Sequence, residues 1–394
     1  MVSSIRDSLA VRHRSVREAL ESAALDALIV THLPNIFYLT GFTGTAGIVV
    51  VTAAKVGLLV DFRYVTFVES MIEGDRGWPD AALLRVQGSY DEALACLIEE
   101  WEITRAGFEA QHLSVSRHRW LTDRLSAEAS AQNGSRTMRE FLPTERIVEH
   151  ARIRKDAYEV ATLRAAATLL SEVARDVLGT VQPGPSEREF AAVIDYKLKS
   201  AGFARPAFDT IVAAGANAAL PHAQPGLRRL QGGDLVVLDF GGVYDGYCVD
   251  LTRTVCLGRP DDEMRRVYDA VAQAQKAALA AVRPGVAATA IDAAARAVLA
   301  ERSLGEAFGH GTGHGLGIEV HEAPRVAPFR PSSSSAQVQT SSPNSEIIEE
   351  GMVFTIEPGA YLPGWGGVRL EDDILVTADG CEVLTDVPRE LAIE

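Results

Sequence analysis

The sequence predicts a mixed α/β protein (an α+β arrangement) with a smaller N-terminal domain and a larger C-terminal domain built from two related halves. Three observations lead to this prediction. The chain has 394 residues, more than one ordinary domain needs. Short apolar runs alternate with helical patterns up to about residue 145. Beyond that point a half-module occurs twice. We therefore expect two domains, at residues 1–145 and 146–394.

The N-terminal domain is predicted from alternating periodicities. Apolar residues at helical spacing are expected to form an amphipathic helix first, followed by strand-type runs and then further helices. The predicted helices cover 5–27, 89–101 and 115–129, and the predicted strands cover 27–30, 47–51 and 56–60. Turn residues separate these runs, which is typical of an α/β domain.

The C-terminal domain is predicted to begin with one long helix over residues 146–180. Ala, Leu and Val recur there at three- and four-residue spacing, and Pro183-Gly184 ends the pattern. Ser186 and Glu189 have the spacing of a capping box, which begins the next helix. Strands at 235–238 and 249–255, helices at 261–282 and 289–300, and strands at 353–356 and 368–376 are expected to follow.

Two segments of this domain repeat one pattern of acidic residues. In each copy a carboxylate follows a glycine by six residues at the end of an apolar run, and a second acidic residue comes after a Gly-rich turn. These residues are Asp239 and Asp250 in the first copy, and Glu357 and Glu371 in the second. The turn in each copy places its two carboxylates on adjacent antiparallel strands, close to opposite one another. Equivalent positions of a duplicated unit meet at a pseudo-twofold axis, so we expect all four carboxylates to lie together.

Four adjacent carboxylates require cations, because like charges repel and raise one another's pKa. Two divalent ions, about 3.5–4 Å apart in dinuclear hydrolases, offset that charge. A Gly- and His-rich strip between the acidic pairs supplies neutral nitrogen donors, and one of His310, His314 and His321 is expected to complete the coordination. Such an oxygen-rich site suits Mn²⁺, with Co²⁺ or Zn²⁺ as alternatives.

Of three further acidic residues near the pattern, two are not expected to bind metal, and the sequence leaves the role of Asp372 open. Asp245 and Asp373 are interpreted as turn or surface residues. Asp372 follows Glu371 directly and should therefore point to the opposite face of its strand.

The duplication also reveals an insertion in the second copy. His321 follows the equivalent His222 by 99 residues, whereas Glu357 follows Asp239 by 118, so the second copy holds 19 additional residues. A Ser-rich stretch at about 328–344 accounts for them and is predicted to be a loop near the mouth of the site.

The net charge argues against some binding partners, and the cysteine content indicates a cellular compartment. The formal net charge of −15 argues against binding to nucleic acids or to anionic membranes. No apolar run is long enough to span a bilayer, and the N-terminus lacks a basic stretch followed by an apolar one. The four cysteines form no C-x-x-C pair. We therefore expect reduced thiols and a cytoplasmic location.

The motifs around the carboxylates resemble those of the pita-bread metallopeptidases, which include methionine aminopeptidase, aminopeptidase P and prolidase. The resemblance spans essentially the whole chain and rests on the segments 250–254 (DLTRT), 313–317 (GHGLG), 357–361 (EPGAY) and 367–371 (GVRLE). The segments 38–42 (YLTGF) and 61–64 (DFRY) resemble the creatinase-type N-terminal domain of the proline branch, which methionine aminopeptidase usually lacks. Creatinase shares this plan but lacks the full ligand set, which argues against creatinase activity here.

This resemblance implies a role for each candidate site residue. The implied ligands of two divalent metal ions per subunit are Asp239, Asp250, His314, Glu357 and Glu371. The implied catalytic residues are Glu357, as a proton shuttle toward the leaving nitrogen, and His222 and His321, as donors to the developing oxyanion. Substrate-binding roles are expected for His310, Tyr361 and Arg369. A salt bridge for Arg369 and plain packing for Tyr361 stay as alternatives.

The implied activity is an exopeptidase that hydrolyses Xaa-Pro bonds. A bond before proline is a tertiary amide with no N–H, and the ring restricts the residue before it, so a dedicated pocket makes chemical sense. We expect small peptides with proline in second position as substrates, and the insertion at the mouth favours a dipeptidase (prolidase). The alternatives are an aminopeptidase P that acts on longer peptides and, more distantly, a non-catalytic binding protein. The resemblance also implies a homodimer.

Overall fold

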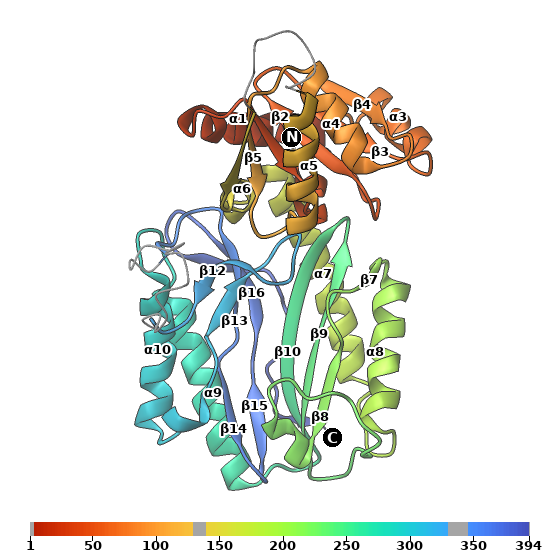
Figure 1. The fold of residues 1–394 in the computed structure, drawn as a ribbon. Coiled ribbons are helices and arrows are strands. Elements are labelled where there is room, and N and C mark those ends of the chain that lie inside the picture. The colour runs from red at the N-terminus through yellow and green to blue at the C-terminus, as the bar shows by residue number, and fades with distance from the viewer. Residues whose placement is uncertain (1–3, 129–138, 330–345, 394) are drawn as a thin grey trace. The chain divides into compact units, whose positions relative to one another are not determined.

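The computed structural model describes residues 4–128, 139–329 and 346–393, and it confirms the mixed α/β fold (Figure 1). The chain divides into two compact units, Met1–Arg152 and Ile153–Glu394. Of the Ser-rich segment predicted at 328–344, all but the first two residues lie outside the described residues.

The first unit is built on one mixed sheet of six strands in the order β4-β3-β2-β1-β5-β6. The strands are β1 (Ala27–Val30), β2 (Ile48–Thr52), β3 (Val56–Val60), β4 (Ala81–Arg85), β5 (Arg105–Glu109) and β6 (Glu140–Thr144). The helices are α1 (Ile5–Ser22), α2 (Leu33–Thr40), α3 (Val65–Glu73), α4 (Tyr90–Glu100), α5 (Val115–Glu128) and α6 (Ile147–Ile153). The central strands β1 and β3 are buried along their whole length, which explains their continuous apolar runs.

The second unit begins with two helices and an antiparallel hairpin. Its first half contains α7 (Ala157–Leu178), α8 (Glu187–Ala201), β7 (Arg205–Pro206), β8 (Ile211–Ala214), the 3₁₀ turn η1 (Gly215–Ala219), β9 (Leu235–Tyr244) and β10 (Tyr247–Leu257). Strands β9 and β10 pair along their whole length, and β7 and β8 pair with the other edge of β9.

The single long helix predicted for residues 146–180 is wrong, because the chain breaks between α6 and α7. Lys155 donates its backbone N–H to the Gly351 carbonyl at 2.8 Å instead of continuing a helix. Asp156 then caps α7 and forms a capping box with Glu159. The helical periodicity was therefore correct on both sides of the break, but the cap signal at Asp156 was missed.

The second half of this unit repeats the order of two helices followed by antiparallel strands. It contains α9 (Asp262–Ala281), α10 (Ala288–Glu301), η2 (Gly305–Ala307), β11 (Gly313–Gly315), β12 (Glu322–Val326), β13 (Val353–Ile356), β14 (Gly359–Leu362), β15 (Gly366–Arg369), β16 (Asp372–Val376), β17 (Cys381–Val383) and β18 (Ala392–Ile393). Helices α7 and α8 lie to one side of the strands and α9 and α10 to the other (Figure 1).

The strand predicted at 368–376 is in fact two strands with different partners. The first part, β15, pairs with β14, whereas β16 pairs with β13 and β17. Between them the backbone N–H of Glu371 donates to the Thr252 carbonyl at 3.1 Å, which joins the second half of the unit to β10 of the first half.

No helix of the described residues is long and apolar enough to cross a membrane.

The core of the second unit packs the apolar faces of α9 and α10 against β13 and β16, with Val271, Ala274, Phe354 and Ile374 fully buried. This packing fixes the strands that carry the candidate site.

Candidate metal centre

The first two candidate ligands lie on the β9–β10 hairpin. A two-residue turn that includes Gly246, at φ 84°, joins the strands. Asp239 pairs with Thr252 and Asp250 pairs with Gly241, so the two carboxylates lie on adjacent antiparallel strands with an offset of two residues. Residues two apart share a face of a strand, and both side chains therefore point to the same side of the hairpin.

The other two carboxylates stand just beyond paired strand residues in the second half. Ile356 pairs with Asp372, so Glu357 and Glu371 lie one position beyond the last pair of β13 and β16. The Thr252 hydroxyl donates to Glu371 Oε2 at 2.6 Å. This bond sets the orientation of a carboxylate from the second half with a side chain of the first.

His314 on β11 is the histidine that reaches the carboxylates. Its Nδ1 donates to the Gly315 carbonyl at 3.1 Å, which leaves the Nε2 lone pair for other partners. That nitrogen lies 3.4 Å from Glu357 Oε1 and 4.0 Å from Asp250 Oδ2. Burial lowers the pKa of His314, which keeps the ring neutral as a ligand must be. The preceding Gly313 allows this approach, because a Cβ there would lie 1.8 Å from the Thr355 carbonyl oxygen.

The five predicted ligands converge on one cavity of about 590 Å³. Ligand atoms of three of them, Asp250, His314 and Glu371, all lie within 4.8 Å of one another. Asp239 and Glu357 line the same cavity. The structure therefore brings together residues of β9, β10 and β11, the residue after β13 and the residue before β16, which are up to 132 positions apart in the sequence.

The cavity has the chemistry of a cation site. Asp239 Oδ1 and Asp250 Oδ1 are buried and have no hydrogen-bond partner among the described residues. Burial, followed by the neighbouring carboxylates, raises the pKa of Asp250 and of Glu371 well above their usual values. Such orphaned oxygens are costly unless a cation binds them. One imidazole nitrogen with several carboxylate oxygens fits two divalent ions of the Mn²⁺, Co²⁺ or Zn²⁺ type.

A chain of hydrogen bonds behind the ligands connects Arg369, Tyr361 and His310. Arg369 Nη1 donates to the Tyr361 hydroxyl at 2.8 Å, and that hydroxyl lies 2.8 Å from His310 Nε2. Because His310 Nδ1 lies 2.8 Å from the Gly311 carbonyl and must donate there, Nε2 accepts from Tyr361. Burial lowers the pKa of His310 to about 4, in agreement with a neutral ring. Arg369 also forms a short ion pair with Asp239.

The hydrogen bonds of this network occupy the side chain of Arg369, for which a substrate-binding role was expected. Its side chain is 4% exposed, and its donors contact Asp239, Tyr361 and Thr252. The guanidinium is therefore occupied by protein groups, which favours the alternative of a salt bridge that orients the ligand Asp239. Tyr361 and His310 belong to the same hydrogen-bond network, and His310 also lines the cavity.

The two histidines expected to act in catalysis stand on the cavity wall. His222 and His321 both line the cavity and both are exposed. The His321 ring packs edge-on against His314, with ring centroids 4.3 Å apart. Although part of the ring is exposed, loss of water on the side that packs against the cavity wall lowers the pKa of His321, so its ring is neutral near pH 7. Both side chains can therefore meet a bound peptide.

Asp373 was wrongly predicted to be a turn or surface residue. It is fully buried on β16, and its Oδ2 accepts the backbone N–H of Asp250 at 3.0 Å. Burial raises the pKa of Asp373 well above its usual value. Its neighbour Asp372 points away from the cavity, as expected from strand alternation, and forms a buried ion pair with Arg253 at 2.7 Å.

Arg325 is a cavity residue that the sequence reasoning missed. It lies on β12, paired with His314 across the β11–β12 ladder, and its exposed side chain lines the cavity. The only signal was its position four residues after His321, on a strand that was not predicted. Its positive charge at the mouth of an acidic cavity is suited to a carboxylate.

The raised pKa of Glu357 predicts how the metal-free protein responds to pH. Burial raises that pKa from the usual 4.5 to about 7. Below pH 4.5 Glu357 is protonated in both the folded and the unfolded state, and the free energy of unfolding has its full value. As the pH rises through 7, the cost of the buried charge lowers that free energy by about 3 kcal/mol in total. We expect the urea midpoint of chelator-treated protein to fall between pH 5 and pH 8. The Glu357→Gln variant should lose part of this dependence; an equal fall in that variant would contradict the assignment.

Comparisons with known proteins agree with this geometry. Residues 161–378 match metallopeptidase family M24, and residues 12–153 match the creatinase/prolidase N-terminal domain. The Xaa-Pro dipeptidase of Pyrococcus horikoshii is 31% identical over 96% of this chain and 97% of its own. The structure of a Xaa-Pro dipeptidase from Bacillus anthracis has a TM-score of 0.86 at 33% identity and covers 98% of this chain and 100% of its own. That of an X-Pro aminopeptidase from Thermotoga maritima has a TM-score of 0.82 at 30% identity, with coverage of 96% and 100%. The chain belongs to metallopeptidase family M24.

Proposed function

We propose that this protein is a metal-dependent Xaa-Pro dipeptidase. The observation that carries the proposal is the convergence of Asp239, Asp250, His314, Glu357 and Glu371 on one cavity. The similarity to Xaa-Pro dipeptidases over nearly the whole chain supports the substrate class. A non-catalytic binding protein would have no need to keep all five side chains in the buried, mutually repelling arrangement observed here.

The chain's own residues are suited to hydrolysis of a bound peptide. The five side chains would hold two divalent ions, which would lower the pKa of a bound water and polarise the scissile carbonyl. Glu357 borders the cavity beside His314 and is proposed to carry a proton toward the leaving proline nitrogen. His222 and His321 on the wall are proposed to donate a hydrogen bond to the developing oxyanion.

Arg325 supports a preference for dipeptides over longer peptides. In a dipeptide the C-terminal carboxylate belongs to the proline that follows the scissile bond. In a tripeptide it moves outward by about 3.3–3.6 Å, the length of one extended residue. The guanidinium of Arg325, which lines the cavity, therefore cannot pair with both carboxylates at the same position, and each requires a different extension of its side chain. We assign Arg325 to the carboxylate of the dipeptide.

The prediction is that Arg325→Ala loses activity on Ala-Pro selectively. Loss of a charge-assisted hydrogen bond should lower kcat/KM for Ala-Pro by about 10- to 100-fold. The value for Ala-Pro-Ala should change much less. Arg283→Ala is the matched control, because Arg283 is exposed and does not line the cavity. Steady-state assays with Mn²⁺ measure both substrates.

The same assay separates the dipeptidase from an aminopeptidase. The likeness to the Thermotoga maritima X-Pro aminopeptidase supports this second candidate. If wild-type protein cleaves Ala-Pro-Ala faster than Ala-Pro, and Arg325→Ala affects both equally, the aminopeptidase is the better description. If neither peptide is cleaved with any of Mn²⁺, Co²⁺ or Zn²⁺, both candidates fail.

We further propose Mn²⁺ as the native ion, a homodimeric assembly and a cytoplasmic location. The oxygen-rich donor set supports Mn²⁺, and the four free cysteines support a reducing compartment. The homodimer follows from the family resemblance alone. Metal analysis of protein purified without added metal tests the first, and light scattering of the purified protein tests the assembly.

A further inference from the structure

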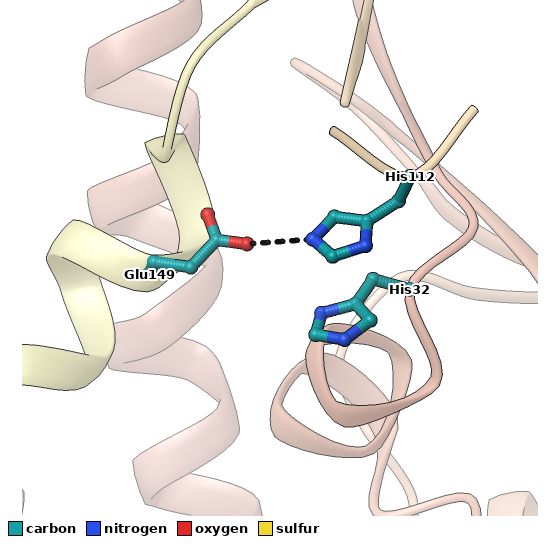
Figure 2. Close-up of side chains that lie close together, drawn as sticks. All are labelled: His32, His112 and Glu149. Carbon is teal, nitrogen blue, oxygen red and sulfur yellow. Dashed lines mark ion pairs between the residues drawn. The ribbon is translucent and has the colours of Figure 1, made fainter. Parts of the chain in front are cut away.

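Two histidines and a glutamate meet in the first unit, far in sequence from the residues of the metal centre. His32 precedes α2, His112 follows β5, and Glu149 lies on α6. One ligand atom from each lies within 4.8 Å of the others. The imidazole rings stack at 3.7 Å between centroids with only 7° between their planes. Figure 2 shows a nitrogen of each ring on the side of the Glu149 carboxylate, which lies 3.8 Å from His112 Nε2.

Glu109 holds the backbone of both histidines, that of His32 through its carboxylate and that of His112 through its backbone carbonyl. Glu109 Oε2 accepts the backbone N–H of His32 at 2.8 Å, and the Glu109 carbonyl accepts the backbone N–H of His112 at 3.1 Å. Glu109 is 7% exposed, so these bonds are shielded from water. The two rings are thus brought together by one residue that itself stands outside the cluster.

The glutamate is tied into the same network. The side-chain amide of the fully buried Asn35 donates through Nδ2 to Glu109 Oε1 at 2.7 Å and to Glu149 Oε1 at 2.6 Å. Its side-chain oxygen Oδ1 accepts from Arg152 Nη1 at 2.7 Å. One side-chain amide therefore sets the position of the Glu149 carboxylate relative to the Glu109 carboxylate, which holds the backbone of His32. Hydrogen-bonded support of this kind is what orients the ligands of protein metal sites.

We propose that His32, His112 and Glu149 form a second metal site, which binds a borderline divalent cation such as Zn²⁺. Two imidazole nitrogens and one carboxylate are a common zinc donor set, and a fourth position remains for water. Side chains of His112 and Glu149 are 29% and 23% exposed, so the ion has access from solvent.

The binding geometry requires only side-chain movement. With bonds of about 2.0–2.1 Å, ligand atoms around a tetrahedral ion lie roughly 3.4 Å apart. The three ligand atoms now lie within 4.8 Å of one another, so the side chains must turn, and the stacked rings must separate, for all three atoms to reach one ion. The backbone of His32 and His112 can stay fixed by Glu109.

An ion at this position would join three segments that are 80 and 37 residues apart. It would close loops in the unfolded chain and bind only the folded unit, so it would stabilise the first unit against unfolding. The site shares no residue with the carboxylate centre, and its existence does not depend on the proposed peptidase activity.

The test is the number of Zn²⁺ ions bound per chain after equilibrium dialysis of the full-length protein against Zn²⁺, measured by elemental analysis. We expect His112→Ala and Glu149→Gln each to bind one ion fewer than wild type. His150→Ala is the matched control, because His150 is an exposed neighbour of Glu149 outside the cluster, and it should bind as many ions as wild type.

Variants of the carboxylate centre keep this result separate from the proposed function. Asp250→Ala should lose ions from the carboxylate centre, and adding His112→Ala should remove one more. Glu149→Gln preserves the size of the side chain, so it remains informative if His112→Ala fails to fold. Equal Zn²⁺ counts in wild type, His112→Ala and Glu149→Gln would overturn the second site, whatever the outcome at the carboxylate centre.

Discussion

Replacement of Asp250 by alanine is expected to abolish peptidase activity while it stabilises the metal-free protein. Asp250 is 5% exposed, and its Oδ1 has no hydrogen-bond partner among the described residues. Loss of a residue that only orients a ligand costs about 10- to 100-fold, so loss of a ligand itself should lower kcat/KM for Ala-Pro by more than about 100-fold. Without metal, however, the same change removes a carboxylate that repels Asp239 and Glu357. The chelator-treated variant should therefore unfold at a higher urea concentration than chelator-treated wild type.

The opposite signs of these two effects make the test specific. A variant that is merely misfolded would lose activity and stability together. Asp245→Asn is the matched control, since Asp245 is an exposed acid at the tip of the same hairpin and should leave turnover unchanged. If Asp250→Ala retained turnover, the ligand role of this carboxylate would be wrong.

Replacement of Arg369 by methionine is expected to give the largest loss of stability in the second unit. The guanidinium pairs with Asp239 and donates to Tyr361 and Thr252 in a buried environment. Removal of one partner of a buried ion pair leaves an uncompensated charge and costs about 3–5 kcal/mol. The urea midpoint of metal-free protein should fall accordingly. Bound metal should reduce the deficit, because a cation also compensates Asp239.

Arg389→Met provides the comparison for this prediction. Arg389 also pairs with a buried carboxylate, Asp372, but its side chain is 40% exposed. Asp372 keeps its buried partner Arg253 when Arg389 is removed. The expected loss is therefore about 1 kcal/mol or less. Equal losses in the two variants would show that the Arg369 network contributes no more than an exposed ion pair.

The sequence was sufficient to predict the mixed α/β fold and the four carboxylates that meet in the cavity, but not Arg325 on its wall. Duplication made this possible, because the four carboxylates occupy equivalent places in two copies of one pattern. Equivalent positions of the two copies then meet without any need to predict the complete topology. His314 was one of three candidates from the Gly-rich strip, and its choice rested on family resemblance and not on spacing.

Other features depend on long-range contacts that spacing does not encode. The break before α7 is made by a bond from Lys155 to Gly351, almost 200 residues away. Asp373 was predicted to be a turn or surface residue because its partner is far away in the sequence. Its carboxylate, in the second half of the unit, accepts the backbone N–H of Asp250 in the first half. In the first unit, His32, His112 and Glu149 share no motif, and only the folded network around Glu109 and Asn35 brings them together.

Anomalous diffraction from crystals grown with Mn²⁺ would examine the dinuclear centre most directly. Two peaks are expected about 3.5–4 Å apart, each in contact with oxygens of Asp239, Asp250, Glu357 or Glu371, and one of them beside His314 Nε2. A cavity without a peak, or with ions bound only by other side chains, would contradict the assignment of these five residues as ligands and, with it, the metal-dependent mechanism.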